Sequence, residues 1–549
     1  VAATLSPLAV GGADLMRSAF CALSLASATA APLVQTRTAL DDAVISLPGW
    51  EGELPSRHYS GYLSVGSISG SPGELHYWLQ ESENDPENDP VIMWINGGPG
   101  SSGMLGMLTE LGQLQTMPSP GDSWLPQNGT TPTLYHNRYG WSKIGSLFTI
   151  EQPKGVGYSS CTNASSSSEC VNTDESTAQD TYEALLAFFE RFPALALRPF
   201  YVTGESYAGT YLPMLMDEID TRGGIPNFAG AAIGNGCWGS SCFYGVSESQ
   251  IDFHTFSGQM FLSPALIEDI EQTCGGRWMD VTTLEGACGG PMKPLDPCSQ
   301  ALEKMCLEVG DGLFNVYNMY DTCYPGNEAT AELTLREVRE RIRRGEVILH
   351  KPSDAMHTHP ILHVSPHSLE GVEAGEGQVA TTAEAAPAPT AKPLGQLNDY
   401  ACGGEGYETK WLDDPQVQAA LHVKPSSGMR YKKTVGDLRG VYERLVQKYR
   451  ILIYSGNVDA CVPTWGSESW TRELGEKLGA TPTAWRPWTS PSASPGSRSS
   501  HVLAGYTMSW PSLSNFTFAT VKGAGHEVPR YKPAFALTLL QRFVKGDGI

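Results

Sequence analysis

The sequence predicts an α/β fold in which a mostly parallel sheet is buried between layers of helices. Short, continuously apolar runs bounded by Gly, Asn or Pro recur along the chain, which is typical of strands buried on both faces. Segments with helical spacing of apolar residues lie between these runs. The chain has 549 residues, of which 41% are hydrophobic and 17% charged, so it has enough apolar material for a large core.

The apolar runs predict five strands of the central sheet, which are Val91–Ile95, Leu147–Ile150, Phe200–Thr203, Ile451–Tyr454 and Phe516–Val521. Two helices are predicted beside them. Residues Thr210–Ile219 have helical spacing directly after the third strand. Residues Thr177–Phe192 form the other helix, which ends before Pro193 and has one apolar face made of Tyr182, Leu185, Leu186 and Phe189.

Two segments interrupt this pattern. Six Cys lie between residues 237 and 306, and we interpret residues 236–334 as an inserted helical cap. The next stretch is rich in Arg and then in Ala, Pro, Thr and Glu, so it cannot form a core, and residues 335–396 are predicted to be a disordered, flexible linker. The core of the fold is therefore expected in two parts, residues 44–235 and 397–549.

The N-terminal region has the features of a secretory signal peptide. Met16 and Arg17 precede a short apolar run that ends in Ala28-Thr29-Ala30, a small-residue cleavage site. We interpret residues 1–15 as upstream sequence and residues 1–30 as absent from the mature chain, although an ordinary Ala-rich tail would also fit. We expect a secreted or vacuolar/lysosomal protein, with glycosylation at the sequons Asn128, Asn163 and Asn515.

Cleavage after Ala30 leaves eleven Cys, an odd number, so at least one free thiol is expected. The short separations 161/170, 237/242 and 298/306 favour small disulfide loops in an oxidising compartment. The paired CxxC spacing typical of structural zinc sites is not present. Four His, at 357, 359, 363 and 367, lie in the predicted linker without a fixed scaffold. We therefore expect neither a metal nor another cofactor.

The charge of the chain excludes several classes of partner. The net charge of −22 and the pI near 5.0 repel phosphate backbones and anionic lipid surfaces. Beyond the N-terminal region there is no apolar run of the ~20 residues that a helix needs to cross a bilayer. We expect no nucleic acid and no membrane as partner, and the sequence leaves the oligomeric state open.

A candidate nucleophile follows the third strand, in the segment Gly204-Glu205-Ser206-Tyr207-Ala208. A strand, a turn of small residues and a helix form the context of a nucleophile elbow, which projects the Ser hydroxyl. The fourth and fifth strands are followed by Asp459 and His526, in the order Ser, Asp, His of α/β hydrolases. In this interpretation Ser206 attacks, His526 takes its proton and Asp459 orients the imidazole. Taken singly, Asp459 also fits a turn and His526 a buried loop.

A glycine-rich loop, Asn96-Gly97-Gly98-Pro99-Gly100, follows the first strand. Glycines let the backbone approach a ligand closely. The amides of Gly98 and Tyr207 could therefore form an oxyanion hole. A plain Gly-Pro turn is the alternative.

Four segments together strongly resemble the serine carboxypeptidases of the α/β-hydrolase fold, the group of carboxypeptidase Y and cathepsin A. They are Asn-Gly-Gly-Pro-Gly at 96–100, Gly-Glu-Ser-Tyr-Ala-Gly at 204–209, Gly-Asn-Gly at 234–236 and Gly-Ala-Gly-His-Glu-Val-Pro at 523–529. The resemblance covers about residues 44–325 and 398–545. It implies that C-terminal residues are removed from peptides and proteins at acidic pH through an acyl-enzyme.

The same resemblance implies roles for further residues. Asn96, Gly97 and Glu205, supported by Trp94 and Glu110, would bind the terminal carboxylate of the substrate. Glu205 fits this role when protonated, because a carboxylic acid can donate a hydrogen bond to a carboxylate. A Glu that merely spaces the elbow is the alternative.

Three further implications concern specificity and disulfides. Glu527, beside His526, would lie close to the leaving residue and favour tolerance of Lys or Arg there. Cys323 would pair with Cys402, and Cys461 would remain free. The pairing among Cys274, Cys288, Cys298 and Cys306 stays open.

Two other functions remain open. A relative could use the same triad for acyl transfer or ester hydrolysis, which a panel of peptide and ester substrates would detect. A binding subunit with a dormant site is the non-enzymatic alternative, and the intact triad, oxyanion loop and carboxylate residues argue against it. The partner that we expect is a peptide or protein with a free C-terminus.

Overall fold

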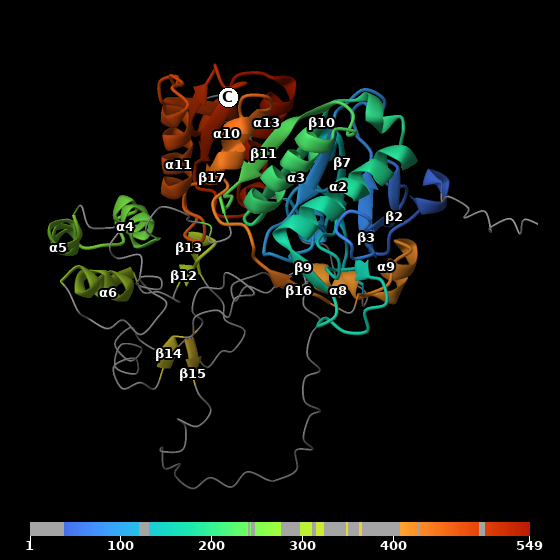
Figure 1. Cartoon of the computed structure of the whole chain (residues 1–549), viewed down its shortest axis with the longest axis horizontal. Coiled ribbons are helices and arrows are strands. Elements are labelled where there is room, and N and C mark those ends of the chain that lie inside the picture. Colours follow the sequence, from blue (N-terminus) through green and yellow to red (C-terminus); the bar gives the residue numbers. More distant parts are fainter. Residues whose placement is uncertain are drawn as a thin grey trace, which may run out of the picture. The chain divides into compact units, whose positions relative to one another are not determined.

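The computed structural model describes residues 38–119, 131–239, 242, 248–275, 297–309, 314–322, 347–349, 362–364, 407–426, 428–492 and 500–549. A mixed 12-stranded sheet forms its centre (Figure 1). The strand order is β1 (Ala43–Val44), β2 (His58–Val65), β3 (Gly73–Gln80), β7 (Ser146–Ile150), β4 (Val91–Ile95), β10 (Phe200–Glu205), β11 (Phe228–Gly234), β17 (Arg450–Gly456), β20 (Phe516–Val521), β19 (His501–Trp510) and β18 (Arg486–Pro491). A short strand, β8 (Ser160–Cys161), pairs with β3.

The strands from β7 to β20 run parallel, and antiparallel strands extend the sheet on both sides. The five predicted strands are confirmed as β4, β7, β10, β17 and β20. Strand β11 was not predicted, because its sequence FAGAAIG consists mainly of small residues without strand propensity. It nevertheless lies between β10 and β17, in the middle of the parallel part.

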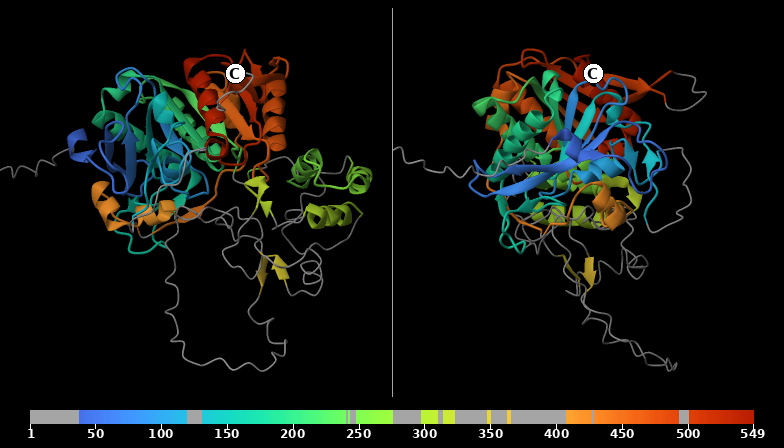
Figure 2. Two further views of the ribbon diagram at one scale, coloured as in Figure 1. Left: turned by 180° about the vertical axis from the view of Figure 1, so that it is seen from behind. Right: turned by 90° about the vertical axis from the view of Figure 1, so that its right-hand side faces the viewer.

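Helices cover both faces of the sheet (Figure 2). One face packs against α2 (Asp174–Arg191), α3 (Ala208–Arg222), α10 (Arg439–Leu445) and α11 (Thr464–Lys477). The other face packs against α1 (Met104–Thr109), α8 (Tyr407–Leu412), α9 (Pro415–Ala420) and α13 (Pro533–Lys545). Side chains of strand β17 alternate between the two faces of the sheet. Ile451 and Ile453 pack in the hydrophobic core on the α2 side, while Leu452 and Tyr454 pack in the core on the α13 side. The continuous apolarity of β17 therefore reflects burial on both faces.

Helix α2 confirms one predicted helix and corrects its buried face. It begins after Thr173, whose side chain accepts a hydrogen bond from the amide of Ser176, and it ends before Phe192-Pro193. Tyr182, Leu185 and Phe189 are buried as predicted, but Leu186 is 37% exposed. The stripe that faces the sheet includes Phe188 instead, and Leu186 lies beside it, next to Gly224.

The residues interpreted as a cap form a small core of their own. Helices α4 (Glu248–Gly258), α5 (Pro264–Cys274) and α6 (Pro297–Val309) pack together with Val458 and Ala460, which flank Asp459. A hairpin of β12 (Phe314–Asn315) and β13 (Asn318–Thr322) follows them. The boundaries 236–334 stay an interpretation. Most of the predicted linker lies outside the described residues. Within residues 335–396 the structure describes β14 (Val347–Leu349) and β15 (Leu362–Val364), which pair antiparallel.

The disulfides confirm two of the three predicted loops. Cys161–Cys170 and Cys237–Cys242 are formed. The expected 298/306 pair is wrong, because Cys298 is bonded to Cys274. Residues 298 and 306 lie about 12 Å apart along α6, too far for a disulfide, whereas the packing of α5 on α6 brings Cys274 to Cys298.

The remaining predictions on Cys and Asn have mixed outcomes. Cys461 is free, as predicted, and its side chain is buried. Cys323 and Cys402 lie outside the described residues, as does Asn128. Asn163 and Asn515 are exposed, so both could carry a glycan.

Among the described helices, none combines the length and apolarity needed to cross a membrane. Within the same residues, no three His, Cys, Asp or Glu side chains gather as a metal site would require.

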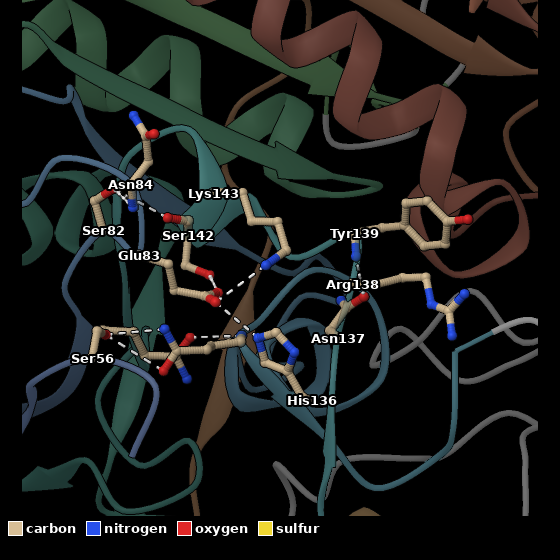
Figure 3. Close-up of polar contacts among 12 residues, drawn as sticks. Ser56, Ser82, Glu83, Asn84, His136, Asn137, Arg138, Tyr139, Ser142 and Lys143 are labelled. Atoms are coloured by element: carbon tan, nitrogen blue, oxygen red, sulfur yellow. Dashed lines mark hydrogen bonds and ion pairs between the residues drawn. The ribbon is translucent and has the colours of Figure 1, made fainter. Parts of the chain in front are cut away.

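The side chain of Glu83 anchors the loop that follows β3 to residues 136–143 (Figure 3). Glu83 accepts hydrogen bonds from Ser142 Oγ (2.7 Å) and Lys143 Nζ (3.1 Å), and His136 Nε2 lies 2.8 Å from its Oε2 atom. Burial opposes ionisation of Glu83, but the bonds to His136 and Ser142 outweigh it and lower its pKa to about 2. Glu83 therefore stays ionised, and its contacts persist, at mildly acidic pH.

Candidate active site

The candidate nucleophile occupies a sharp turn between β10 and α3. Ser206 has a φ angle of 60°, in the left-handed region that non-glycine residues rarely adopt. Only glycine fits beside it: a Cβ atom on Gly97 would lie 2.6 Å from Ser206 Cβ, and one on Gly209 would lie 2.2 Å from the Cys237 carbonyl oxygen. The predicted strand–turn–helix context of Ser206 is therefore present.

Asp459 and His526 are brought together as predicted. The Nδ1 atom of His526 lies 2.8 Å from Oδ2 of Asp459, and Asp459 is 1% exposed. Asp459 also accepts hydrogen bonds from Asn235 Nδ2 (2.8 Å) and from the amides of Cys461 (2.8 Å) and Val462 (3.1 Å). These donors hold the carboxylate rigidly against the imidazole. Asn235 comes from the Gly-Asn-Gly segment that follows β11.

A tyrosine that the sequence did not indicate supports His526. The His526 ring stacks on that of Tyr317, with centroids 4.5 Å apart and an interplanar angle of 12°. The His526 amide donates to the Tyr317 carbonyl oxygen (2.7 Å). Tyr317 lies in the turn of the β12–β13 hairpin, which carries no recognisable motif. Nδ1 faces Asp459, and Nε2 is buried without a hydrogen-bond partner among the described residues, Ser206 included. Nε2 is therefore available to a bound group.

The buried thiol of Cys461 lies beside this pair but is not a second nucleophile. Burial raises the pKa of Cys461 well above its ordinary value, and the charge of Asp459 raises it further. Because the thiolate is the reactive form, a thiol that stays protonated is inert.

The two predicted oxyanion donors flank Ser206. Within the described part of the chain, the amides of Gly98 and Tyr207 have no protein acceptor. The Tyr207 side chain is anchored elsewhere, since its hydroxyl donates to Asp174 Oδ1 (2.7 Å). The glycine loop is held by a bond from the Gly100 amide to the Tyr211 hydroxyl (3.2 Å). Both amides are thus free to bind an oxyanion.

A buried hydrogen-bond network around Glu151, which the sequence did not indicate, holds the segment that follows the glycine loop. Glu151 accepts a hydrogen bond from Ser102 Oγ, and its Oε2 lies 2.8 Å from His76 Nδ1. The Tyr158 amide also donates to Glu151 (2.9 Å). The sequence position of Glu151, directly after strand β7, could have indicated this network, because a carboxylate at the end of a buried strand needs hydrogen-bond partners.

The predicted carboxylate-binding residues form one cluster around Asn96. Its Oδ1 atom accepts hydrogen bonds from Trp94 Nε1 (2.8 Å) and from the Gly106 amide (3.0 Å). These donors turn Nδ2 toward Glu205 Oε1 (2.9 Å) and Glu110 Oε1 (3.1 Å). The sequence positions 96, 110 and 205 thus meet at one point, next to Ser206.

Both glutamates of this cluster favour the protonated form. Burial raises the pKa of Glu205 well above its ordinary value, and the charges of Glu110 and Glu527 raise it further. Burial and then the charge of Glu527 likewise raise the pKa of Glu110. The cluster therefore carries protons at acidic pH and can donate hydrogen bonds to an anion.

Glu527 lies at the start of α12 (Val528–Tyr531) and is 3% exposed. Its Oε2 atom forms an ion pair with Arg530 Nη1 (2.7 Å). The sequence predicted that Glu527 faces the leaving residue but did not indicate this partner. Its effect on the pKa of both Glu110 and Glu205 indicates that it belongs to the same electrostatic cluster.

Comparison with known proteins gives a single family. The family model described as serine carboxypeptidase matches residues 48–546. Serine carboxypeptidase-like 20 of Arabidopsis thaliana is 32% identical, with 94% of this chain and 95% of that protein covered. Serine carboxypeptidase 1 of Hordeum vulgare is 30% identical, with 92% of both covered. Lysosomal protective protein of Mus musculus is 29% identical, with 92% and 94% covered.

A solved structure supports the fold. Kex1(delta)p, a prohormone-processing carboxypeptidase from Saccharomyces cerevisiae, superposes with a TM-score of 0.59 at 18% identity and covers 93% of this chain and 97% of its own. The family match over residues 48–546 and the near-complete coverage of the relatives agree with this likeness. The chain therefore belongs to the serine carboxypeptidase family and is a peptidase with the α/β-hydrolase fold.

Proposed function

We propose that the enzyme removes C-terminal residues from peptides and proteins at acidic pH, through a Ser206–His526–Asp459 triad and an acyl-enzyme. The observation that carries this proposal is the buried Asn96–Glu110–Glu205 cluster, which directly adjoins the nucleophile. An exopeptidase must bind a terminal carboxylate, whereas an ordinary esterase has no use for buried carboxyl groups beside its serine. The cluster thus favours carboxypeptidase activity over ester hydrolysis or acyl transfer.

The proposed acylation step uses the residues around Ser206. Ser206 Oγ attacks the scissile carbonyl carbon while Nε2 of His526 takes its proton, and Asp459 stabilises the imidazolium. The amides of Gly98 and Tyr207 donate to the developing oxyanion. When the intermediate collapses, His526 gives the proton to the nitrogen of the departing residue, and the C–N bond breaks. Water then attacks the acyl-enzyme by the same steps and releases the shortened peptide.

We assign recognition of the C-terminus to the residues of the Asn96 cluster. Asn96, the amide of Gly97 and the protonated carboxyl of Glu205 would bind the terminal carboxylate, with Trp94 fixing the Asn96 amide and Glu110 sharing its protons. Two ionised carboxylates repel each other, so binding weakens as the cluster loses protons at higher pH. This requirement is the physical reason for an acidic working range.

A digest of mixed-sequence peptides, followed by mass spectrometry, tests the proposed activity. At pH 4–6 we expect products shortened one residue at a time from the C-terminus. The same peptides with an amidated C-terminus should react at least tenfold more slowly, because the amide lacks the charge that the cluster recognises. Internal cleavage, equal rates for free and amidated peptides, or turnover of esters alone would contradict the proposal.

Glu527 gives a smaller prediction on specificity. If it reaches the leaving residue, its charge favours Lys or Arg, but its ion pair with Arg530 already offsets part of that charge. We therefore expect Glu527→Met to lower the ratio of kcat/KM for peptides ending in Arg to that for peptides ending in Leu, by less than tenfold. Glu476→Met, at an exposed position on α11, is the control. Identical ratios in all three enzymes would remove Glu527 from the leaving-residue site.

We also propose that the enzyme works in the secretory pathway, as a secreted or vacuolar/lysosomal protein. Three disulfides within the described residues support an oxidising compartment. The exposed sequons at Asn163 and Asn515 and the similarity to a lysosomal protective protein agree with this location.

A further inference from the structure

The residues that end neighbouring strands line up across the sheet beside the nucleophile. Glu205 of β10 is in register with Gly234 of β11, and Gly234 is in register with Tyr454 of β17. The pairing of Gly204 with Ile95 places Asn96 at the level of Glu205 on the other side. Partners in register between parallel strands point to the same face of a sheet. Asn96, Glu205 and Tyr454 therefore share one face.

The gap over Gly234 is filled by the Tyr454 ring. A Cβ atom on Gly234 would lie 2.6 Å from Cε2 and Cζ of Tyr454 and 2.7 Å from its hydroxyl oxygen. The ring thus leans over β11 in the direction of β10. Neighbouring strands are about 4.8 Å apart, so the hydroxyl lies roughly one strand spacing from Glu205. The glycine is what allows this approach.

The Tyr454 hydroxyl is buried and has no hydrogen-bond partner among the described residues. The Oε2 atoms of Glu205 and Glu110 are buried beside it and accept no hydrogen bond from another kind of residue in the same part of the chain, although the two carboxyl groups bond to each other. Buried polar atoms are rarely left unpaired in folded proteins. Burial, together with the charges of Glu205 and Glu110, raises the pKa of Tyr454 well above its ordinary value. The phenol therefore remains a donor at every pH at which the glutamates titrate.

We propose that Tyr454 is a positioning residue of the carboxylate-binding site, whose hydroxyl turns to donate a hydrogen bond to Oε2 of Glu205 when a terminal carboxylate binds. In the described structure both atoms are still unpaired with each other. With Oε1 held by Asn96, this bond fixes the plane of the carboxyl group and aims its proton at the substrate carboxylate. The inference rests on the proposed carboxypeptidase function and adds a residue to it. The other charged groups that act on Glu205 are Glu110 at the end of α1 and Glu527 at the start of α12. Arg530 is the ion-pair partner of Glu527 and acts on Glu110.

The variant Tyr454→Phe keeps the ring and removes only the hydroxyl. We expect the KM for a peptide with a free C-terminus to rise about fivefold at pH 5, with kcat changed less than twofold, because Glu205 loses its orientation. A hydrogen bond to the ionised form lowers the pKa of a carboxyl group, so its loss raises that pKa. The pH at which KM begins to rise should therefore move upward by about half a unit or more.

Two control variants test whether the Tyr454 hydroxyl acts through Glu205. Tyr182→Phe, a buried tyrosine whose hydroxyl donates to the Gly223 carbonyl oxygen far from the site, should leave KM and its pH profile unchanged. In a Glu205→Gln background, Tyr454→Phe should no longer shift the pH profile, since the carboxyl group on which the Tyr454 hydroxyl acts is gone.

The outcomes distinguish the inference from the function on which it depends. If wild type discriminates free from amidated peptides but Tyr454→Phe keeps both its KM and its pH profile, the role of Tyr454 is wrong and the function stands. If Tyr454→Phe raises KM equally for free and amidated peptides without a pH shift, the hydroxyl is merely structural and the inference is also wrong. If wild type does not discriminate, the proposed function itself fails.

Discussion

Replacing Ser206 by Ala should lower peptidase turnover by about 10⁴- to 10⁶-fold and leave the fold intact. The loss is large because the nucleophile, the base and the oriented carboxylate act as a unit. Asp459 already holds His526 at 2.8 Å, so every element of the acylation step except the attacking oxygen remains in the variant. The small Ala side chain fits the turn, although its φ of 60° is unfavourable for any residue with a Cβ atom.

Turnover of a free C-terminal peptide at pH 5 measures the effect, and a fluorophosphonate that labels activated serines identifies the nucleophile. Wild type should be labelled at Ser206 alone. Ser166→Ala, in an exposed turn, should keep full activity and labelling. Circular dichroism and the melting temperature report whether Ser206→Ala is folded. A folded Ser206→Ala variant that retains substantial activity would disprove the assignment of the nucleophile.

The parts of the site that the sequence could predict are those built from local sequence. The elbow at Ser206 depends on a strand, small residues and a helix within about twenty positions, and each leaves its own pattern. Asp459 and His526 could be placed because the carboxyl ends of parallel strands meet at one edge of a sheet. Their contact at 2.8 Å bears this out.

What could not be predicted depends on packing between distant elements. The partner of Cys298 is set by the packing of α5 against α6, which spacing along the chain does not reveal. The support of His526 by Tyr317 depends on a hairpin without a motif. The approach of Tyr454 to Glu205 depends on the register of three strands, one of which, β11, was not itself predicted. In each case the information lies in tertiary contacts.

The acidic residues illustrate the same limit, because the pKa values of two glutamates are shifted in opposite directions. Glu83 has cationic and hydroxyl partners and stays ionised, with a pKa of about 2. Glu205 is buried among other carboxyl groups, and its pKa is raised. A protonated Glu205 could be predicted from the chemistry that an exopeptidase needs, but only the structure shows the burial that causes it.

Glu205→Gln should remove most of the pH dependence of substrate binding. In wild type the KM for a free C-terminal peptide should rise above the folded-state pKa of the cluster, up to tenfold for each further pH unit, as the protonated fraction of Glu205 falls. Gln keeps a donor in nearly the same place and does not titrate. Between pH 5 and pH 8 the KM of the variant should therefore rise much less than that of wild type, with Glu110 as the remaining titrating group of the cluster. Glu190→Gln, at an exposed position on α2, should behave as wild type.

Stability gives a second readout of the same group. Because the folded-state pKa of Glu205 is raised above its ordinary value of 4.5, the folded protein binds this proton more tightly than the unfolded chain does. The resulting stabilisation is complete below pH 4.5 and is lost as the pH rises through the folded-state pKa. As the pH rises from 4.5 through the folded-state pKa of Glu205, the melting temperature of wild type should therefore fall more than that of Glu205→Gln. A KM profile and a melting curve that both follow wild type would remove Glu205 from the carboxylate site and leave Glu110 as the titrating group of the cluster.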